Sequence, residues 1–232
     1  MTTLSRNARV AGLLYILASA VGVVRLIYIP NKLFVHGDAT ATAANIAGHE
    51  TLFRLGIVCG LVGAALWLFV PLALYRVLKD VNRGPAVLMV VLGSFMQVPL
   101  FFCNSVTDIA ALLLARGAGY LAVFDKAQRD ALARLFLDLH HHLDLANMMF
   151  AGLWLVPFGL LVYRSRYFPR FLGVWLMIAS LPYLALCIGG FLLPGSEDAI
   201  FSYGQPLMLG EVAMMLWLVI MGAKDEGLAV AR

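Results

Sequence analysis

The sequence predicts an all-α fold, a polytopic membrane bundle of six transmembrane helices, with a short amphipathic outer helix before the fourth span. The first observation is composition: of 232 residues, 62% are hydrophobic and only 13% are charged, whereas soluble domains carry roughly 25% charged residues. The second is that six segments are long enough to cross a bilayer core, which requires ~20 apolar residues. A soluble protein of this size could not bury so much apolar surface.

The six predicted spans follow one another closely, so we treat residues 1–232 as a single integral membrane domain. Their approximate limits are 10–29, 53–75, 86–115, 144–163, 171–193 and 206–223. Basic residues such as Arg6 and Arg9 before an apolar run are also typical of signal peptides. Here, however, the apolar run continues to Ile29, which is too long for the apolar region of a signal peptide. We therefore expect the first segment to be retained as a helix.

Basic residues at the ends of the spans predict the orientation. Ten lie in short connections and tails on one side: Arg6, Arg9, Arg76, Lys79, Arg83, Arg164, Arg166, Arg170, Lys224 and Arg232. Five lie in longer loops on the other: Lys32, Arg116, Lys126, Arg129 and Arg134. The positive-inside rule then places both termini in the cytoplasm, with the chain in the cytoplasmic membrane.

The two outer loops have helical character of their own. Residues 39–48 are small and permit a helix. Residues 125–139 place apolar side chains at helical spacing, which predicts an amphipathic helix lying on the outer surface and leading into the fourth span. The alternative is a solvated loop helix without membrane contact. The apolar side chains are Leu132, Leu135, Phe136 and Leu139.

The second span carries two local signals that we interpret as structural. Small residues recur every four positions, the pattern that lets helix backbones approach closely; they are Gly56, Gly60 and Ala64. Glu50 and Arg54 form an i,i+4 pair at the head of this span, a spacing that favours an ion pair on one helix face.

Ionisable side chains inside the apolar segments are the strongest clue to function. A charge at the bilayer centre costs at least ~2.5–3.5 kcal/mol, so such residues face a partner or a wet cavity. Helical spacing places polar side chains on one face of the third span and on one face of the fourth, near the outer side. With charges at similar depth in the first and sixth spans, they predict an outward-facing polar cavity. The candidate ligand-binding residues are Arg25, Gln97, Asn104, Asp108, His140, Asp144, Asn147 and Glu211.

Two interpretations of these charges stay open. In the first, the carboxylates and a histidine bind a small ligand, a metal or a proton. In the second, Arg25 pairs with Glu211 or Asp108 only to hold helices together, and a buried ion pair is weak evidence even of stability.

The run His140-His141-His142 offers at most two side chains to one site, because consecutive helix residues are about 100° apart. His140 and Asp144, and likewise Asp138 and His142, have the i,i+4 spacing at which two ligands share a metal. No HExxH motif accompanies them, so we expect no metal site and keep His140, His142 and Asp144 as weak candidates only. A histidine cluster that caps and hydrates a helix start is the favoured interpretation, and a pH-sensitive role is a third.

Several function classes lack their signatures. The sequence has no GxSxG, P-loop, dinucleotide-binding or haem-attachment motif, and we expect no cofactor. The net charge of +4 comes from dispersed basic residues rather than a patch, which argues against a nucleic-acid partner. The three cysteines, Cys59, Cys103 and Cys187, lie far apart within apolar segments, and an odd count without CxxC spacing argues against a disulfide framework or a zinc site.

Four stretches resemble one family of bacterial membrane proteins, domain of unknown function 4386. They are ARVAGLLYILASAVGVV in the first span, ATAANIAGHETLFRLGIVCGLV entering the second, YRSRYFPRFLGVWLMIASLPYL across the fourth-to-fifth connection, and LGEVAMMLWLVIMG in the last. The resemblance covers nearly the whole chain in the same order. It implies an uncharacterised six-helix integral membrane protein of prokaryotes, and it implies no reaction.

The sequence thus favours a multi-pass membrane protein that binds or passes a small polar or amphiphilic ligand through the outward cavity. One alternative is a metal-dependent intramembrane lipid hydrolase, in which His140 or His142 acts with Asp108, Asp144 and Glu211. Another is an accessory subunit whose buried charges pair with a partner's helices, although no motif indicates a partner or an oligomeric state. The partner that the sequence does indicate is the lipid bilayer.

Overall fold

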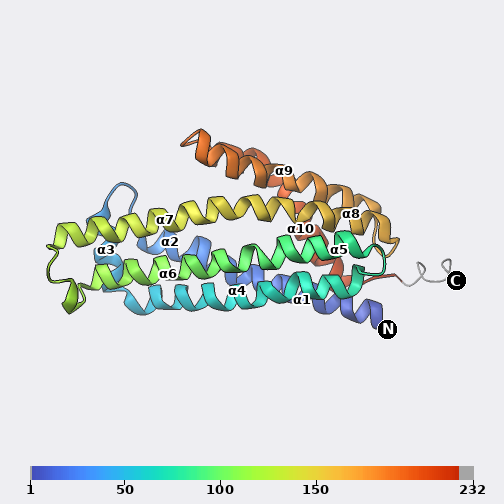
Figure 1. Cartoon of the computed structure of the whole chain (residues 1–232), viewed down its shortest axis with the longest axis horizontal. Helices are drawn as coiled ribbons and strands as arrows, with labels where there is room; N and C mark the ends of the chain where they lie inside the picture. The colour runs from blue at the N-terminus through green and yellow to red at the C-terminus, as the bar shows by residue number, and fades with distance from the viewer. Residues whose placement is uncertain (1, 225–232) are drawn as a thin grey trace. The chain divides into compact units, whose positions relative to one another are not determined.

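The computed structural model describes residues 2–224. Within them the chain is helical, with no strands, and six helical segments are long and apolar enough to cross a membrane (Figure 1). Both findings confirm the predicted fold class. The segments are Thr3–Leu33, Glu50–Leu78, Arg83–Arg116, Lys126–Ser165, Arg170–Leu192 and Glu197–Ile220.

Several of these segments consist of more than one helix. The first joins α1 (Thr3–Val23), a π-helical turn η1 (Val24–Tyr28) and α2 (Ile29–Leu33); the second is α4 (Glu50–Leu78). The third joins α5 (Arg83–Val90), a second π-helical turn η2 (Val91–Phe95) and α6 (Gln97–Arg116), and the fourth joins α7 (Lys126–Leu153) and α8 (Leu155–Ser165). The last two are α9 (Arg170–Leu192) and α10 (Glu197–Ile220). The connection between the first and second segments contains α3 (Ala39–Gly48), and that between the third and fourth contains a 3₁₀ turn, η3 (Gly119–Leu121).

Close contacts divide the chain into two compact units. Unit 1 comprises Met1–Leu17, Leu66–Val98 and Leu145–Arg232, and unit 2 comprises Ala18–Ala65 and Pro99–Asp144. Helices α1, α4, α6 and α7 are continuous in sequence across the boundaries between these ranges. The prediction of a single domain stays a prediction.

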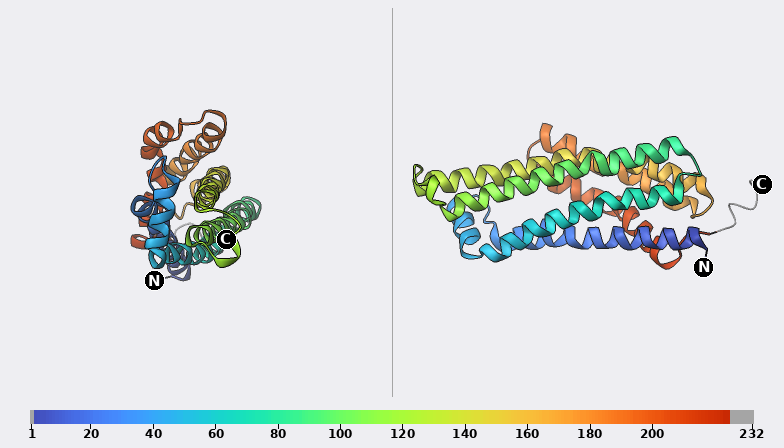
Figure 2. Two further views of the ribbon diagram at one scale, coloured as in Figure 1. Left: turned by 90° about the vertical axis from the view of Figure 1, so that its left-hand side faces the viewer. Right: turned by 60° about the horizontal axis from the view of Figure 1, so that its bottom comes forward.

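Aromatic side chains and glycines pack unit 1. Trp154 stacks on Phe158 with ring centroids 5.3 Å apart, and Trp67 meets Trp154 edge-on at 5.5 Å. Helices α8 and α9 lie side by side in both views (Figures 1 and 2). They approach closely at two glycines, since a Cβ added to Gly173 would lie 2.6 Å from the carbonyl oxygen of Gly159. Small residues thus allow tight helix packing here, as they do in membrane proteins generally.

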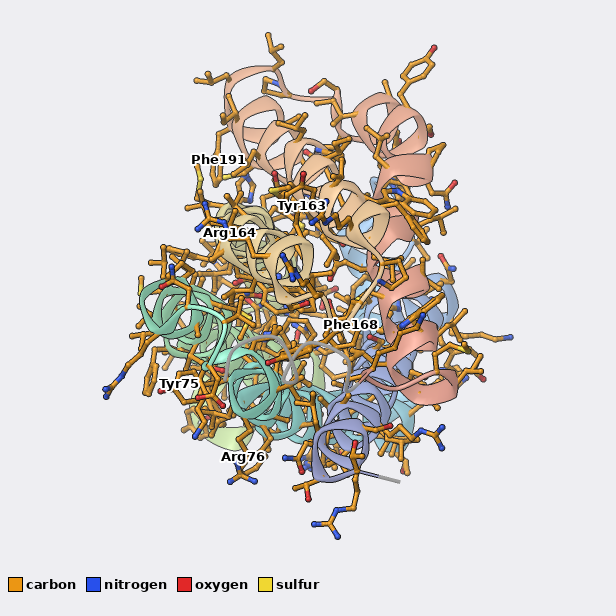
Figure 3. The ribbon with its side chains drawn as sticks, turned by 90° about the vertical axis from the view of Figure 1, so that its right-hand side faces the viewer. Tyr75, Arg76, Tyr163, Arg164, Phe168 and Phe191 are labelled. Carbon is orange, nitrogen blue, oxygen red and sulfur yellow. The ribbon has the colours of Figure 1, made fainter. Side chains whose placement is uncertain are left out.

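Basic side chains mark the helix ends of unit 1. Arg76 and Arg164, near the ends of α4 and α8, are exposed (Figure 3). The guanidinium of Arg170, at the start of α9, lies 5.6 Å from the ring centroid of Tyr163, within the range of a cation–π contact.

Unit 2 has its own apolar core, and the loop after α2 folds onto it. The core residues are Ile29, Leu33, Ile46, Phe53, Ile57, Ala111, Leu112 and Leu137. Asp38 caps α3 by accepting a hydrogen bond of 2.8 Å from the Ala41 amide. Thr42 accepts one of 2.9 Å from the Val35 amide, and Asn45 donates one of 3.1 Å to the Leu33 carbonyl. Residues 39–48 therefore form a helix, as their composition predicts.

The amphipathic stretch before the fourth span differs from the prediction. Residues 126–139 are helical, but they form the first half of α7 rather than a separate surface helix. Phe136 packs against the core of unit 2, while Leu135 and Leu139 are exposed. The reason is that no glycine or proline interrupts the chain between Lys126 and Ala151, so nothing ends the helix before the span.

Candidate functional site

Arg25 lies in the π-helical turn η1, which belongs to unit 2. π-Helices are rare and appear mostly as single turns inside α-helices, frequently at functional sites. The Arg25 side chain is only 10% exposed. Its aliphatic stem runs over Gly60 of α4, where an added Cβ would lie 3.1 Å from the Arg25 Cδ and 3.2 Å from its Nε. Gly60, predicted as a helix-packing residue, thus makes room for a cationic side chain.

Arg25, Asn104, Asp108, His140 and Asp144 form one polar cluster in unit 2. The Arg25 Nη2 lies 2.8 Å from the His140 Nε2 and 3.9 Å from the Asp144 Oδ1. His140 stands between two carboxylates, with Nδ1 2.8 Å from the Asp108 Oδ1 and Nε2 3.2 Å from the Asp144 Oδ2. Asn104 donates a hydrogen bond of 2.5 Å to the Asp144 Oδ1. Helix-face spacing explains this convergence, because Asn104 and Asp108, and likewise His140 and Asp144, are four residues apart.

The polar cluster has spare hydrogen-bonding capacity. Two of its atoms, the Arg25 Nε and the Asn104 Oδ1, are buried and make no hydrogen bond to the described residues. One guanidinium and one imidazole face two carboxylates, so the charges balance when His140 is protonated, and one negative charge is in excess when it is neutral. A buried polar group without a partner is costly, which favours a bound polar group or water at this position.

Two cavities in unit 2 meet at the polar cluster. The larger has a volume of about 370 Å³ and is lined by Arg25, Leu26, Pro30, Phe34, Val35, His36, Arg134, Leu137, Asp138, His140, His141 and Asp144. The smaller, about 30 Å³, is lined by Arg25, Ile29, Pro30, Phe34, Phe53, Gly56, Ile57, Asp108 and His140. The first falls in the size range of small-molecule pockets, and the second has room for one or two waters. Arg25 and His140 line both cavities.

Three of the eight candidate residues lie in unit 1 instead. Gln97 donates a hydrogen bond of 3.3 Å to the Leu92 carbonyl, within its own segment. Asn147 is 4% exposed, and its Oδ1 makes no hydrogen bond within the described chain. Glu211 is 8% exposed and contacts two tyrosines, described below. The structure therefore brings five of the eight candidates together.

The predicted structural pairs have different outcomes. Glu50 and Arg54 form an ion pair of 2.6 Å, which confirms that prediction, and Arg116 extends it with a contact of 3.0 Å to Glu50. Within unit 2, Arg25 pairs with Asp144 and contacts His140, rather than forming the predicted pair with Asp108.

Sequence reasoning missed several residues of these sites. His36 and Arg134 line the larger cavity, although they lie outside the predicted spans. Tyr15 and Tyr183 contact Glu211 from α1 and α9. The sequence feature that could have indicated the two tyrosines is their hydroxyl group, because a tyrosine buried in an apolar segment needs a hydrogen-bond partner.

The weak metal candidates do not gather at one point. The two ring nitrogens of His140 face different carboxylates, and the Nδ1 of exposed His142 lies 2.7 Å from the Asp138 carbonyl oxygen of its own helix. Among residues 2–224, no group of three or more His, Cys, Asp or Glu side chains is arranged to hold a metal ion.

The comparison with protein families agrees with the fold. The model of a domain of unknown function (DUF4386) matches residues 10–222, which is most of the chain. The chain belongs to the DUF4386 family. This DUF4386 protein is also 40% identical over 82 residues to an "Uncharacterized protein" of Archaeoglobus fulgidus. That match covers 35% of the chain and 47% of the relative, so the chain spans about half the length of the curated relative that it matches. No solved structure matches the DUF4386 protein.

Proposed function

We propose that this protein binds a small amphiphilic ligand in the 370 Å³ cavity of unit 2, with the ligand's polar head against the polar cluster. The observation that carries the proposal is the mixed lining of that cavity. One part of the wall is apolar, from Leu26, Pro30, Phe34, Val35 and Leu137, and the other part is polar, from Arg25, His140 and Asp144 among others. A ligand with an apolar tail and one polar head matches both parts.

The charges of the lining determine which heads fit. Arg134 and Asp138 pair with each other at 2.8 Å and so contribute no net charge. The polar cluster adds the guanidinium of Arg25, the imidazole of His140 and the carboxylates of Asp108 and Asp144. Arg25 and His140 already pair with these carboxylates, and an anionic head would be repelled by the carboxylates at low dielectric. We therefore propose a cationic or uncharged head rather than an anionic one.

The proposed cavity opens on the outer side of the membrane. This orientation is supported by the distribution of basic residues, ten at one set of span ends and five at the other. By the positive-inside rule, the end with fewer basic residues, which includes the loops of unit 2, is expected outside. In that orientation the ligand enters from the external leaflet or from the medium. Passage of the ligand across the membrane would require a second opening, for which a transport assay is the test.

Ligand binding is tested with two probes of equal tail length and opposite head charge. Purified protein in lipid nanodiscs is titrated with decyltrimethylammonium and with decanoate, and binding is measured as a shift in the unfolding temperature. We expect the cationic probe to bind more tightly by about tenfold, which corresponds to ~1.4 kcal/mol. Asp144→Asn should remove most of that preference, because it removes a carboxylate that lines the cavity.

The matched control is Asp198→Asn, which removes an exposed carboxylate from the first turn of α10 in unit 1. This variant should keep the preference of the native protein. Equal shifts with both probes in the native protein, or tighter binding of decanoate, would contradict the proposed head chemistry. No shift with either probe would contradict ligand binding in this cavity.

The lipid hydrolase and accessory-subunit alternatives stay predictions. Metal analysis of the purified protein tests the first, since a metal-dependent hydrolase should contain a stoichiometric metal ion and lose activity with a chelator. Co-purification from native membranes tests the second.

A further inference from the structure

Glu211 forms a second polar site, in unit 1, that the proposed ligand cavity does not use. It lies on α10, and its side chain is buried, with 8% of the residue exposed. Tyr15 of α1 donates a hydrogen bond from its hydroxyl to the Glu211 Oε2. Tyr183 of α9 is hydrogen-bonded to the same carboxyl group. Three helices of one unit thus meet at a single acidic side chain.

Unit 1 supplies hydrogen bonds to Glu211 but no opposite charge. None of the described Lys, Arg or His side chains of unit 1 forms an ion pair with its carboxyl group. Transfer of an ionised carboxylate into an apolar environment without a counter-ion costs many kcal/mol, and the group becomes neutral instead. Intramembrane acidic residues are rare, and the functions that they mark include proton relays. This contrasts with Asp144, which has Arg25 at 3.9 Å.

The surroundings of Glu211 are aromatic and closely packed. Tyr15 is 1% exposed and meets Trp67 and Trp154 edge-on, at centroid distances of 5.5 and 5.9 Å. The indole N–H of Trp67 is bonded to the Gly93 carbonyl at 2.7 Å. On the α9 side, the indole of Trp175 packs directly over Gly210, where an added Cβ would lie 2.8 Å from it. Such walls keep the dielectric low around the carboxyl group.

We infer that Glu211 is a proton-binding site, whose resting form at neutral pH is the carboxylic acid held between the hydroxyls of Tyr15 and Tyr183. In this form the acid donates its O–H to one tyrosine oxygen and accepts the hydroxyl of the other, so both carboxyl oxygens are hydrogen-bonded and no net charge is buried. Among the described residues of unit 1, the titratable groups that face it are these two tyrosines, one from α1 and one from α9. The inference is independent of the ligand proposed for unit 2.

Infrared spectroscopy tests the protonation state directly. The protein, with ¹³C-carboxyl glutamate to distinguish glutamate from aspartate, is reconstituted in lipid at neutral pH. We expect a carbonyl band of a protonated glutamic acid in the native protein, and complete loss of that band in Glu211→Gln. The matched control is Asp198→Asn on the same helix, which should leave the band unchanged. A native spectrum with glutamate only as carboxylate would overturn the inference.

A second variant keeps the test decisive if Glu211→Gln does not insert. Tyr15→Phe removes one hydrogen bond from the carboxyl group and keeps the aromatic packing, so the acid band should persist and move to higher frequency. Persistence at an unchanged frequency would assign the proton to another glutamate and contradict the site. Transfer to D₂O adds a measure of exchange: a downshift of the band shows that the proton exchanges with water, and a band that never shifts excludes a role in proton transfer.

Discussion

At the scale of single residues, the absence of a side chain at Gly60 leaves the space that the Arg25 side chain of the polar cluster occupies. The Gly60 Cα faces the stem of Arg25, so Gly60→Val should push the guanidinium away from His140 and Asp144. Overpacking of this kind costs roughly 1–3 kcal/mol. We expect a lower unfolding temperature and a loss of most cationic probe binding, both measured on purified protein.

The control for that variant is Gly63→Val, on the same helix and in the same unit. A Cβ at Gly63 meets only the Val21 Cγ1, at an ordinary contact distance of 3.7 Å. Gly63→Val should therefore leave probe binding near the native level. Equal effects of the two substitutions would show that α4 tolerates neither, and would remove the special role of Gly60.

Residue spacing predicts about half of the candidate site. Asn104 with Asp108, and His140 with Asp144, share helix faces because four residues make about one turn, and each pair does converge. The similar depth of Glu211 in the sixth span predicts that it joins the same cavity. Depth along a helix does not determine the direction of a side chain, and the structure gives Glu211 its own partners in unit 1.

At the scale of secondary-structure elements, the cap of α3 has a measurable contribution to unit 2. Asp38→Ala removes the acceptor for the Ala41 amide, and loss of such an N-cap costs typically ~1 kcal/mol. Hydrogen exchange followed by mass spectrometry should show faster exchange at residues 39–42. Asp38→Asn keeps an acceptor at this position, so its exchange should resemble that of the native protein; faster exchange in both variants would rule out the cap as the cause.

Hydropathy predicts where the helices are but not their full extent. The spans predicted at 53–75 and 144–163 are observed as Glu50–Leu78 and Lys126–Ser165. The helices continue past the apolar run because polar residues at their ends form helical hydrogen bonds as well as apolar ones do. The sequence did not predict the turns η1 and η2. Val24–Tyr28 has a composition common in ordinary α-helices. Val91–Phe95 contains Gly93 and Ser94, which weaken a helix but do not specify a π turn.

At the scale of the whole molecule, the predicted orientation has a direct test. In a background with the three native cysteines replaced by serine, single cysteines are placed at Val123, which is 82% exposed, and at Asn82, which is exposed. A membrane-impermeant maleimide added to intact cells should label Val123→Cys at once and Asn82→Cys only after permeabilisation. The reverse pattern would place both termini outside and the proposed cavity on the cytoplasmic side.

The π-helical turn at Val24–Tyr28 also gives a marker for sorting DUF4386 proteins. A π turn contains one residue more than the α turn that it replaces, so a homologue with a one-residue deletion between the counterparts of α1 and α2 would form a regular helix there. The residues after the deletion would then be rotated by about 100° relative to those before it. An arginine at the aligned position would point elsewhere in such a homologue. Counting residues between two alignable helices therefore separates family members that keep the Arg25 geometry from those that share only the fold.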